Sequence, residues 1–114
     1  MNSIRLGTCS WKYESWKGLI YPQTEKFNYL TEYSNHFNTV EIDQWFWSLF
    51  SLTRVVLPQK KTVTEYKNSV PNDFLFTIKL PNSITLTHFY RKNKLKELVN
   101  NPHFLSIDLY NQFI

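Results

Sequence analysis

Hydrophobic residues follow two different spacings along this chain, and the change from one spacing to the other marks the expected elements. Short apolar runs predict strands over 4–9, 39–43 and 74–80. Elsewhere apolar residues recur every third or fourth position, as on one face of a helix, and predict helices over 26–38, 62–69 and 107–114. Ser106 is the expected cap of the last helix. This alternation is typical of a parallel α/β sheet with right-handed crossovers.

The second strand shows which side chains should face the core. Val40 and Ile42 share one face of it. Glu41 and Asp43 share the other face. In a barrel the outward face of each strand packs on helices and is apolar, so Glu41 should point inward or towards the mouth. The same alternation in the third strand places Lys79 opposite the apolar face.

The predicted units are too few for a closed fold. A TIM-type (β/α)8 barrel has eight strand–helix units and about 250 residues, whereas this chain has 114 residues. Three parallel strands leave both edges of the sheet with unpaired backbone groups. We therefore predict an α/β fold in which 1–114 form a single incomplete domain, the first three βα units of a truncated TIM-type barrel. The open edges would need the remaining barrel segment or self-association to cover them.

Composition and charge narrow the class of protein. Aromatic residues make up 18% of the chain. Such residues more often fill a core, but they can also line a pocket for a flat ligand. The net charge is +4, with cations gathered at 91–96; a nucleic acid is a possible but disfavoured partner, because no binding motif accompanies them. The single cysteine, Cys9, excludes an internal disulfide. Without a signal peptide or an apolar membrane span, we expect a cytoplasmic protein with no membrane contact.

Ordered motifs connect the chain with a known family. The segments are IRLGTCSW (4–11), WKGLIYP (16–22), HFNTVEID (36–43), FLFTIK (74–79) and ITLTH (84–88). Through them the chain resembles the N-terminal part of the YecE-like family, domain of unknown function 72. The resemblance implies a TIM-type barrel and brings no activity, because none is established for the family. It also exposes departures: Asp43 stands where the family usually has asparagine, and Ser48 where it often has an arginine that could bind an anion.

Candidate catalytic residues follow from the barrel geometry, which places the active site at the carboxyl ends of the strands. They are Glu41 and Asp43 from the second strand, and Lys79 and His88 from the third strand and its loop. Glu41 could act as a general base while Lys79 binds an anionic group or stabilises developing negative charge. Equally, the two could form a buried ion pair that closes the barrel core.

The same residues could instead bind a metal ion. Glu41, Asp43 and His88 would suit a divalent cation. Acids of this kind more often join hydrogen-bond networks, so we assign no metal ligand, and the cofactor is unknown. The chain has only two glycines, Gly7 and Gly18, which excludes a phosphate-binding glycine loop.

Aromatic residues near the expected mouth are the candidate ligand-binding residues. They are Trp11, Tyr13, Trp16, Trp45 and Trp47. They could form a stacking wall for a sugar or a base, or they could pack over the end of the barrel. Cys9, at the end of the first strand, could be a nucleophile, although such a cysteine is more often a small buried residue.

The sequence leaves several functions open. The chain could be an enzyme that acts on a small polar ligand at the carboxyl-terminal mouth of the barrel. It could also be a non-catalytic module that binds a nucleic acid or a carbohydrate, or a non-functional truncated fragment. No pattern in the sequence selects a reaction.

Overall fold

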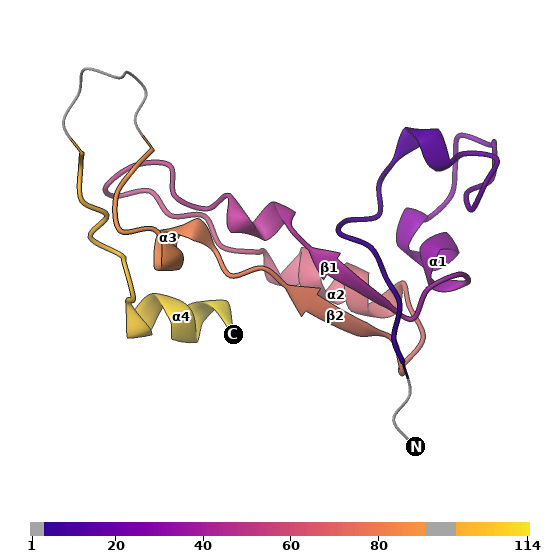
Figure 1. Cartoon of the computed structure of the whole chain (residues 1–114). Helices are drawn as coiled ribbons and strands as arrows, with labels where there is room; N and C mark the ends of the chain where they lie inside the picture. Colours follow the sequence, from indigo (N-terminus) through magenta and orange to yellow (C-terminus); the bar gives the residue numbers. More distant parts are fainter. Residues whose placement is uncertain (1–3, 91–97) are drawn as a thin grey trace. The chain divides into compact units, whose positions relative to one another are not determined.

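The computed structural model describes residues 4–90 and 98–114, which form a mixed α/β structure. Its elements are η1 (Glu14–Trp16), α1 (Tyr29–Ser34), β1 (Thr39–Ile42), η2 (Gln44–Phe46), α2 (Lys60–Asn68), β2 (Leu75–Ile78), α3 (Asn82–Thr85) and α4 (Ile107–Phe113) (Figure 1). The chain divides into two compact units, Met1–Asp43 with Gln59–Lys79 and Gln44–Pro58 with Leu80–Ile114. None of the described helices is long and apolar enough to cross a membrane.

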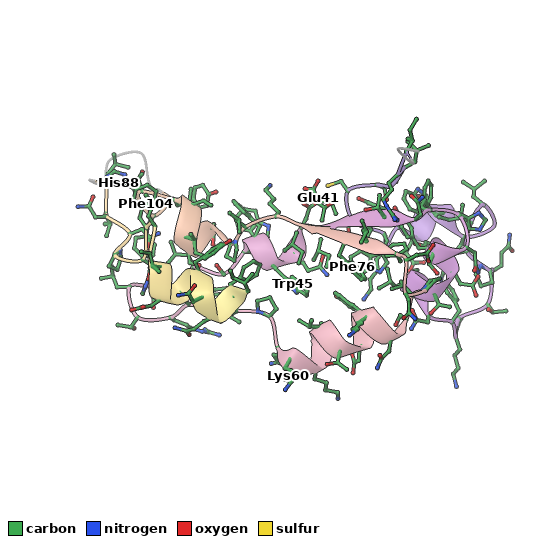
Figure 2. The ribbon with its side chains drawn as sticks, turned by 90° about the horizontal axis from the view of Figure 1, so that it is seen from below. Glu41, Trp45, Lys60, Phe76, His88 and Phe104 are labelled. Carbon is green, nitrogen blue, oxygen red and sulfur yellow. The ribbon has the colours of Figure 1, made fainter. Side chains whose placement is uncertain are left out.

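A parallel pair of strands, β1 and β2, is the centre of the first unit. Its register runs from Thr39↔Leu75 to Ile42↔Ile78. Val40 and Ile42 are each 1% exposed, which confirms the predicted apolar face of β1. In Figure 2 the labelled Glu41 and Phe76 lie on opposite sides of the strands, with α2 on the Phe76 side. The strands predicted at 39–43 and 74–80 are therefore present in shorter form.

The strand predicted at 4–9 is wrong. Within this segment only Cys9 forms a ladder contact, an isolated parallel bridge to Glu41. Two backbone bonds flank the bridge, from Ser10 N to the Glu41 carbonyl (2.9 Å) and from Glu41 N to the Thr8 carbonyl (3.0 Å). Upstream of the bridge, side chains accept the backbone N–H groups that a ladder would use. The segment lies beside β1 without becoming a strand of the sheet.

Tyr33, on α1, is the side chain that replaces much of this ladder. It is fully buried, and its hydroxyl accepts a hydrogen bond from Thr8 N at 2.7 Å and donates to the Thr39 carbonyl at 3.0 Å. Its ring stacks on Phe37, with 4.8 Å between the ring centroids. One phenol therefore ties α1, the 4–9 segment and the start of β1 together.

Replacing Tyr33 with phenylalanine should lower the free energy of unfolding by about 2 kcal/mol, because it leaves an N–H and a carbonyl group inside the first unit without this partner. Urea unfolding followed by tryptophan fluorescence measures the change. Tyr29→Phe is the matched control, since the Tyr29 hydroxyl donates to the exposed Glu14 carboxylate, and it should cost less than about 0.5 kcal/mol. Equal losses in the two variants would contradict the role given to Tyr33.

The observed helices lie where the sequence predicts them, but their lengths differ from the predicted lengths. Of the helix predicted over 26–38, only α1 is present. It begins after Asn28, because the Asn28 side chain caps its first turn by accepting two backbone N–H groups. The prediction over 62–69 corresponds to α2. At α4 the expected cap is confirmed: Ser106 Oγ accepts the N–H of Leu109 at 3.2 Å.

Buried polar side chains hold the second unit together. Ser48, Asn82, Ser83 and Asn101 are all 5% exposed or less. Asn82 Oδ1 accepts the backbone N–H of Ser48 at 3.0 Å, and the hydroxyls of Ser48 and Ser83 lie 2.7 Å apart. Asn101 Nδ2 donates to the carbonyls of Ser83 and Leu86, each at 2.8 Å. Ser48, where the resemblance led us to expect an arginine, is an interior serine with satisfied hydrogen bonds.

Candidate acid–base site at the end of β1

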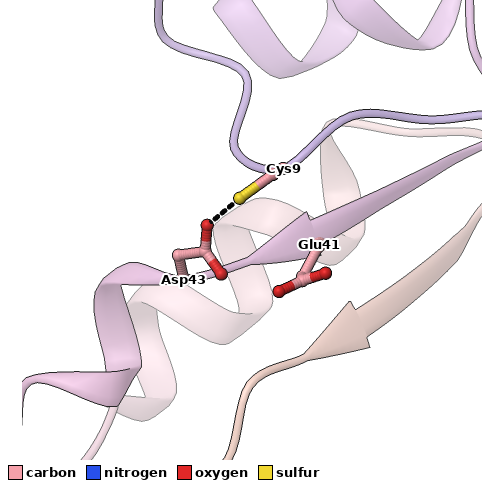
Figure 3. Close-up of side chains that lie close together, drawn as sticks. All are labelled: Cys9, Glu41 and Asp43. Atoms are coloured by element: carbon pink, nitrogen blue, oxygen red, sulfur yellow. Dashed lines mark hydrogen bonds between the residues drawn. The ribbon is translucent and has the colours of Figure 1, made fainter.

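Cys9, Glu41 and Asp43 come together at the carboxyl end of β1 (Figure 3). Glu41 lies in the strand and Asp43 directly follows it, so alternation turns both side chains to the same face. The bridge between Cys9 and Glu41 brings in the thiol, which donates a hydrogen bond to Asp43 Oδ2. One ligand atom from each of these residues lies within 4.8 Å of the other two.

Lys79 adds a positive charge to this cluster. It is the first residue after β2, and its backbone N–H donates to the Ile42 carbonyl at 3.1 Å. Alternation from Thr77, which pairs with Glu41, places Lys79 on the same face of the sheet. Its charge acts to lower the pKa of both Glu41 and Asp43. Three of the predicted catalytic residues thus belong to one neighbourhood.

The two carboxyl groups differ in their affinity for a proton. Hydrogen bonding to Asp43, together with repulsion from its charge and partial burial, raises the pKa of Glu41. The hydrogen bond from the Cys9 thiol is the main cause that lowers the pKa of Asp43. Of the two acids, Glu41 therefore releases its proton at the higher pH and Asp43 at the lower pH. Among the described residues Asp43 Oδ1 is buried without a hydrogen-bond partner.

Cys9 differs from the small buried residue that the sequence favoured. It is exposed and unpaired with another cysteine, and its hydrogen bond to Asp43, followed by desolvation and the nearby acids, raises the pKa of its thiol. A thiol that stays protonated is a poor nucleophile. The sequence named Cys9 but missed its role as a hydrogen-bond donor, because that role depends on the register between the 4–9 segment and β1.

A small open cavity of about 260 Å³ is lined in part by Cys9 and Glu41. Its lining residues are Arg5, Gly7, Thr8, Cys9, Thr39, Val40, Glu41 and Thr77. Most of them are polar or small, and the volume lies just below the common range for sites of drug-sized ligands. The space suits a small polar molecule more than an extended or aromatic one.

The aromatic candidates of the first unit are largely packed. Trp11 is 1% exposed and sits edge-on against Tyr66, with ring centroids 5.1 Å apart. This correction removes Trp11 as a stacking surface, because its ring is enclosed in the core. Trp16 is half-buried and contacts Tyr13, with centroids 4.6 Å apart. Tyr13 remains close to the cluster, since its hydroxyl donates to the Cys9 carbonyl at 2.6 Å.

The remaining candidates belong to the second unit, so the cluster at β1 is defined without them. Trp45 is half-buried, whereas Trp47 is 63% exposed and lies beside Tyr90, with ring centroids 6.0 Å apart. His88 Nδ1 lies 2.8 Å from Thr87 Oγ1. The cationic run at 91–96 falls outside the described residues.

A metal ion would find a different donor set from the one predicted. Cys9 joins Glu41 and Asp43 in place of His88, and zinc accepts both sulfur and carboxylate ligands. Binding would require the thiolate, which the raised pKa of Cys9 disfavours. We therefore assign no metal to the cluster.

The parallel pair of β1 and β2, with helices beside it and two acids at the carboxyl end of β1, makes the first unit an α/β structure. A family model then identifies the family. The model described as "Protein of unknown function DUF72" matches residues 5–107. The chain therefore belongs to this family, as the ordered motifs indicated. Searches of the curated proteins and of the solved structures found no match. The family is described as one of unknown function, so membership assigns no activity to the site.

Proposed function

We propose that the first unit is part of a TIM-type barrel and that Glu41 and Asp43 transfer a proton on a small polar ligand at its mouth. The neighbour relations support the barrel: the 4–9 segment contacts β1 through a parallel bridge, and β1 pairs with β2 in parallel. Consecutive parallel neighbours with intervening helices are the barrel's order. Leu75 and Ile78 of β2 are 52% and 41% exposed, and further barrel strands or self-association would cover them.

The observation that carries the chemistry is the opposite shift of two adjacent carboxyl groups. A pair whose surroundings push the pKa values apart supplies one acid and one base. Here Glu41 can give a proton while Asp43 can receive one. Lys79, on the same face, would stabilise negative charge that develops on the ligand. This combination fits the removal of a proton from a carbon next to a carbonyl group, followed by its return.

The pH dependence of such a reaction has a defined sign. The lowered pKa of Asp43 means that the ionised base is lost only as the pH falls below its ordinary range. The raised pKa of Glu41 means that the acid is lost as the pH rises above its ordinary range. Activity should therefore appear in a bell-shaped window between these values, where the pair holds one proton.

Hydrogen–deuterium exchange at carbon tests this function. The 114-residue chain is incubated in D2O with dihydroxyacetone or its phosphate, and proton NMR follows the loss of the C–H signals. We expect exchange faster than in buffer alone, with a bell-shaped pH profile and a preference for the phosphate, which Lys79 would attract. Exchange equal to the buffer rate for both compounds at every pH would rule out the proposed proton transfer.

A carbohydrate-binding module without catalysis is the second candidate. The observation in its favour is the neighbouring pair Trp47 and Tyr90, whose rings belong to residues that are 63% and 57% exposed. Exposed aromatic faces stack on sugar rings. Quenching of tryptophan fluorescence by a cyclic sugar such as xylose, abolished by Trp47→Ala and unaccompanied by any exchange activity, would favour this candidate over the first.

A further inference from the structure

We propose that Cys9 is a positioning residue of this site: by donating its S–H to Asp43, it determines which of the two carboxyl groups carries the charge. Its catalytic consequence rests on the proton transfer proposed above. The hydrogen bond itself is a separate property of the chain, which can be measured without any substrate.

The backbone on both sides of Cys9 is held in place. The Glu41 N–H donates to the Thr8 carbonyl at 3.0 Å, and the Ser10 N–H donates to the Glu41 carbonyl at 2.9 Å. The Tyr13 hydroxyl donates to the carbonyl of Cys9 itself at 2.6 Å. These bonds fix the Cys9 backbone relative to β1, so the thiol reaches Asp43 without an ordering cost during the reaction.

The turn that follows Cys9 is also specified. Ser10 has a φ of 62°, in the left-handed region that a non-glycine residue seldom adopts. The Thr8 hydroxyl donates to the Ser10 carbonyl at 2.6 Å and holds this conformation. The chain therefore leaves β1 immediately after the bridge, and in Figure 3 the thiol points at the Asp43 carboxylate.

The thiol makes the two carboxyl groups unequal. Among the described residues its hydrogen bond goes to Asp43 Oδ2, and a donor favours the charged form of the carboxylate that accepts it. Glu41 shares the face of β1 with Asp43, and Lys79 lowers the pKa of both acids. Lys79 therefore shifts the pKa values of both acids in the same direction. The thiol, in contrast, contacts one of the two directly, Asp43. Without the S–H donor, the proton would be divided more evenly between the two groups.

Carboxyl titration by carbon-13 NMR tests this role on the 114-residue chain. In Cys9→Ala we expect the pKa of Asp43 to rise by about 1 and the pKa of Glu41 to fall towards it, since one hydrogen bond is lost. Cys9→Ser keeps a donor in the same place and should retain the separation of the wild type. Amide spectra and urea unfolding establish that each variant is folded.

Chemical modification of the Cys9 thiol gives a second test that does not depend on the alanine substitution. Methyl methanethiosulfonate caps the exposed thiol of the folded wild type as a mixed disulfide, which removes the S–H donor. The capped chain should titrate as Cys9→Ala does. Unchanged carboxyl titration after capping and in Cys9→Ala would overturn the proposal, and so would a Cys9→Ser variant that titrates like the alanine variant. Because no substrate is present, a failed exchange assay leaves these outcomes unaffected.

Discussion

Replacing Glu41 with glutamine is expected to slow carbon–deuterium exchange about 100-fold to 10,000-fold, the usual contribution of one general acid or base. The amide keeps the size of the side chain and its place on β1, but it cannot hold and release a proton. Asp43 keeps its hydrogen bond from Cys9 and stays ionised, but the neighbouring amide cannot supply a proton to the ligand. The residual activity of this variant should no longer fall at alkaline pH, because that fall reports the ionisation of Glu41.

Glu65→Gln is the matched control for this loss. Glu65 belongs to the same unit on α2, its side chain is 60% exposed, and its carboxylate lies 3.9 Å from the Lys61 ammonium, at the outer limit of such contacts. The control should exchange deuterium at the wild-type rate. If both variants lose activity equally, or if Glu41→Gln loses none, the acid–base assignment is wrong.

Replacing Gly7 with alanine should destabilise the first unit by about 3 kcal/mol. A Cβ at this position would lie 2.0 Å from the Thr39 carbonyl oxygen and 2.7 Å from its carbon. Both are backbone atoms at the start of β1, so they cannot move aside without disturbing the pairing with β2. Urea unfolding followed by tryptophan fluorescence measures the loss, and the Cys9 hydrogen bond to Asp43 should weaken with it.

Gly18→Ala provides the comparison, because it strains the chain in a different way. Its Cβ would meet the far end of the flexible Gln23 side chain at 2.8 Å, and the residue has a φ of 82°. The expected cost is about 1 kcal/mol, mostly from the left-handed backbone. A Gly7→Ala variant as stable as Gly18→Ala would show that the 4–9 segment does not lie against β1.

The sequence predicted those features that depend on local spacing. Val40 and Ile42 alternate with Glu41 and Asp43 within one short run, and alternation in a strand is a property of neighbouring residues. The cap at Ser106 is equally local. For this reason the apolar face of β1, the last helix and the shared face of both acids could all be derived from the order of residues alone.

Features that depend on distant side chains could not be derived in this way. The 4–9 run has the composition of a strand, but Asn38 and Tyr33 take its N–H groups, and neither contact has a signature in the run itself. The sequence leaves open whether Trp11 lines a ligand wall or packs over the end of the barrel, whereas in the structure its ring is buried edge-on against Tyr66 of α2. The thiol hydrogen bond at Asp43 likewise required the register of a non-local contact.

The serine at position 48 also limits which single substitutions the second unit can accept. Ser48 is enclosed, with Asn82 and Ser83 bonded to it. An arginine introduced alone would place an unpaired guanidinium among groups that already have partners, at a high desolvation cost. A large charged residue at position 48 is therefore tolerated only after Asn82 and Ser83 have changed, so no single mutational step can place one there.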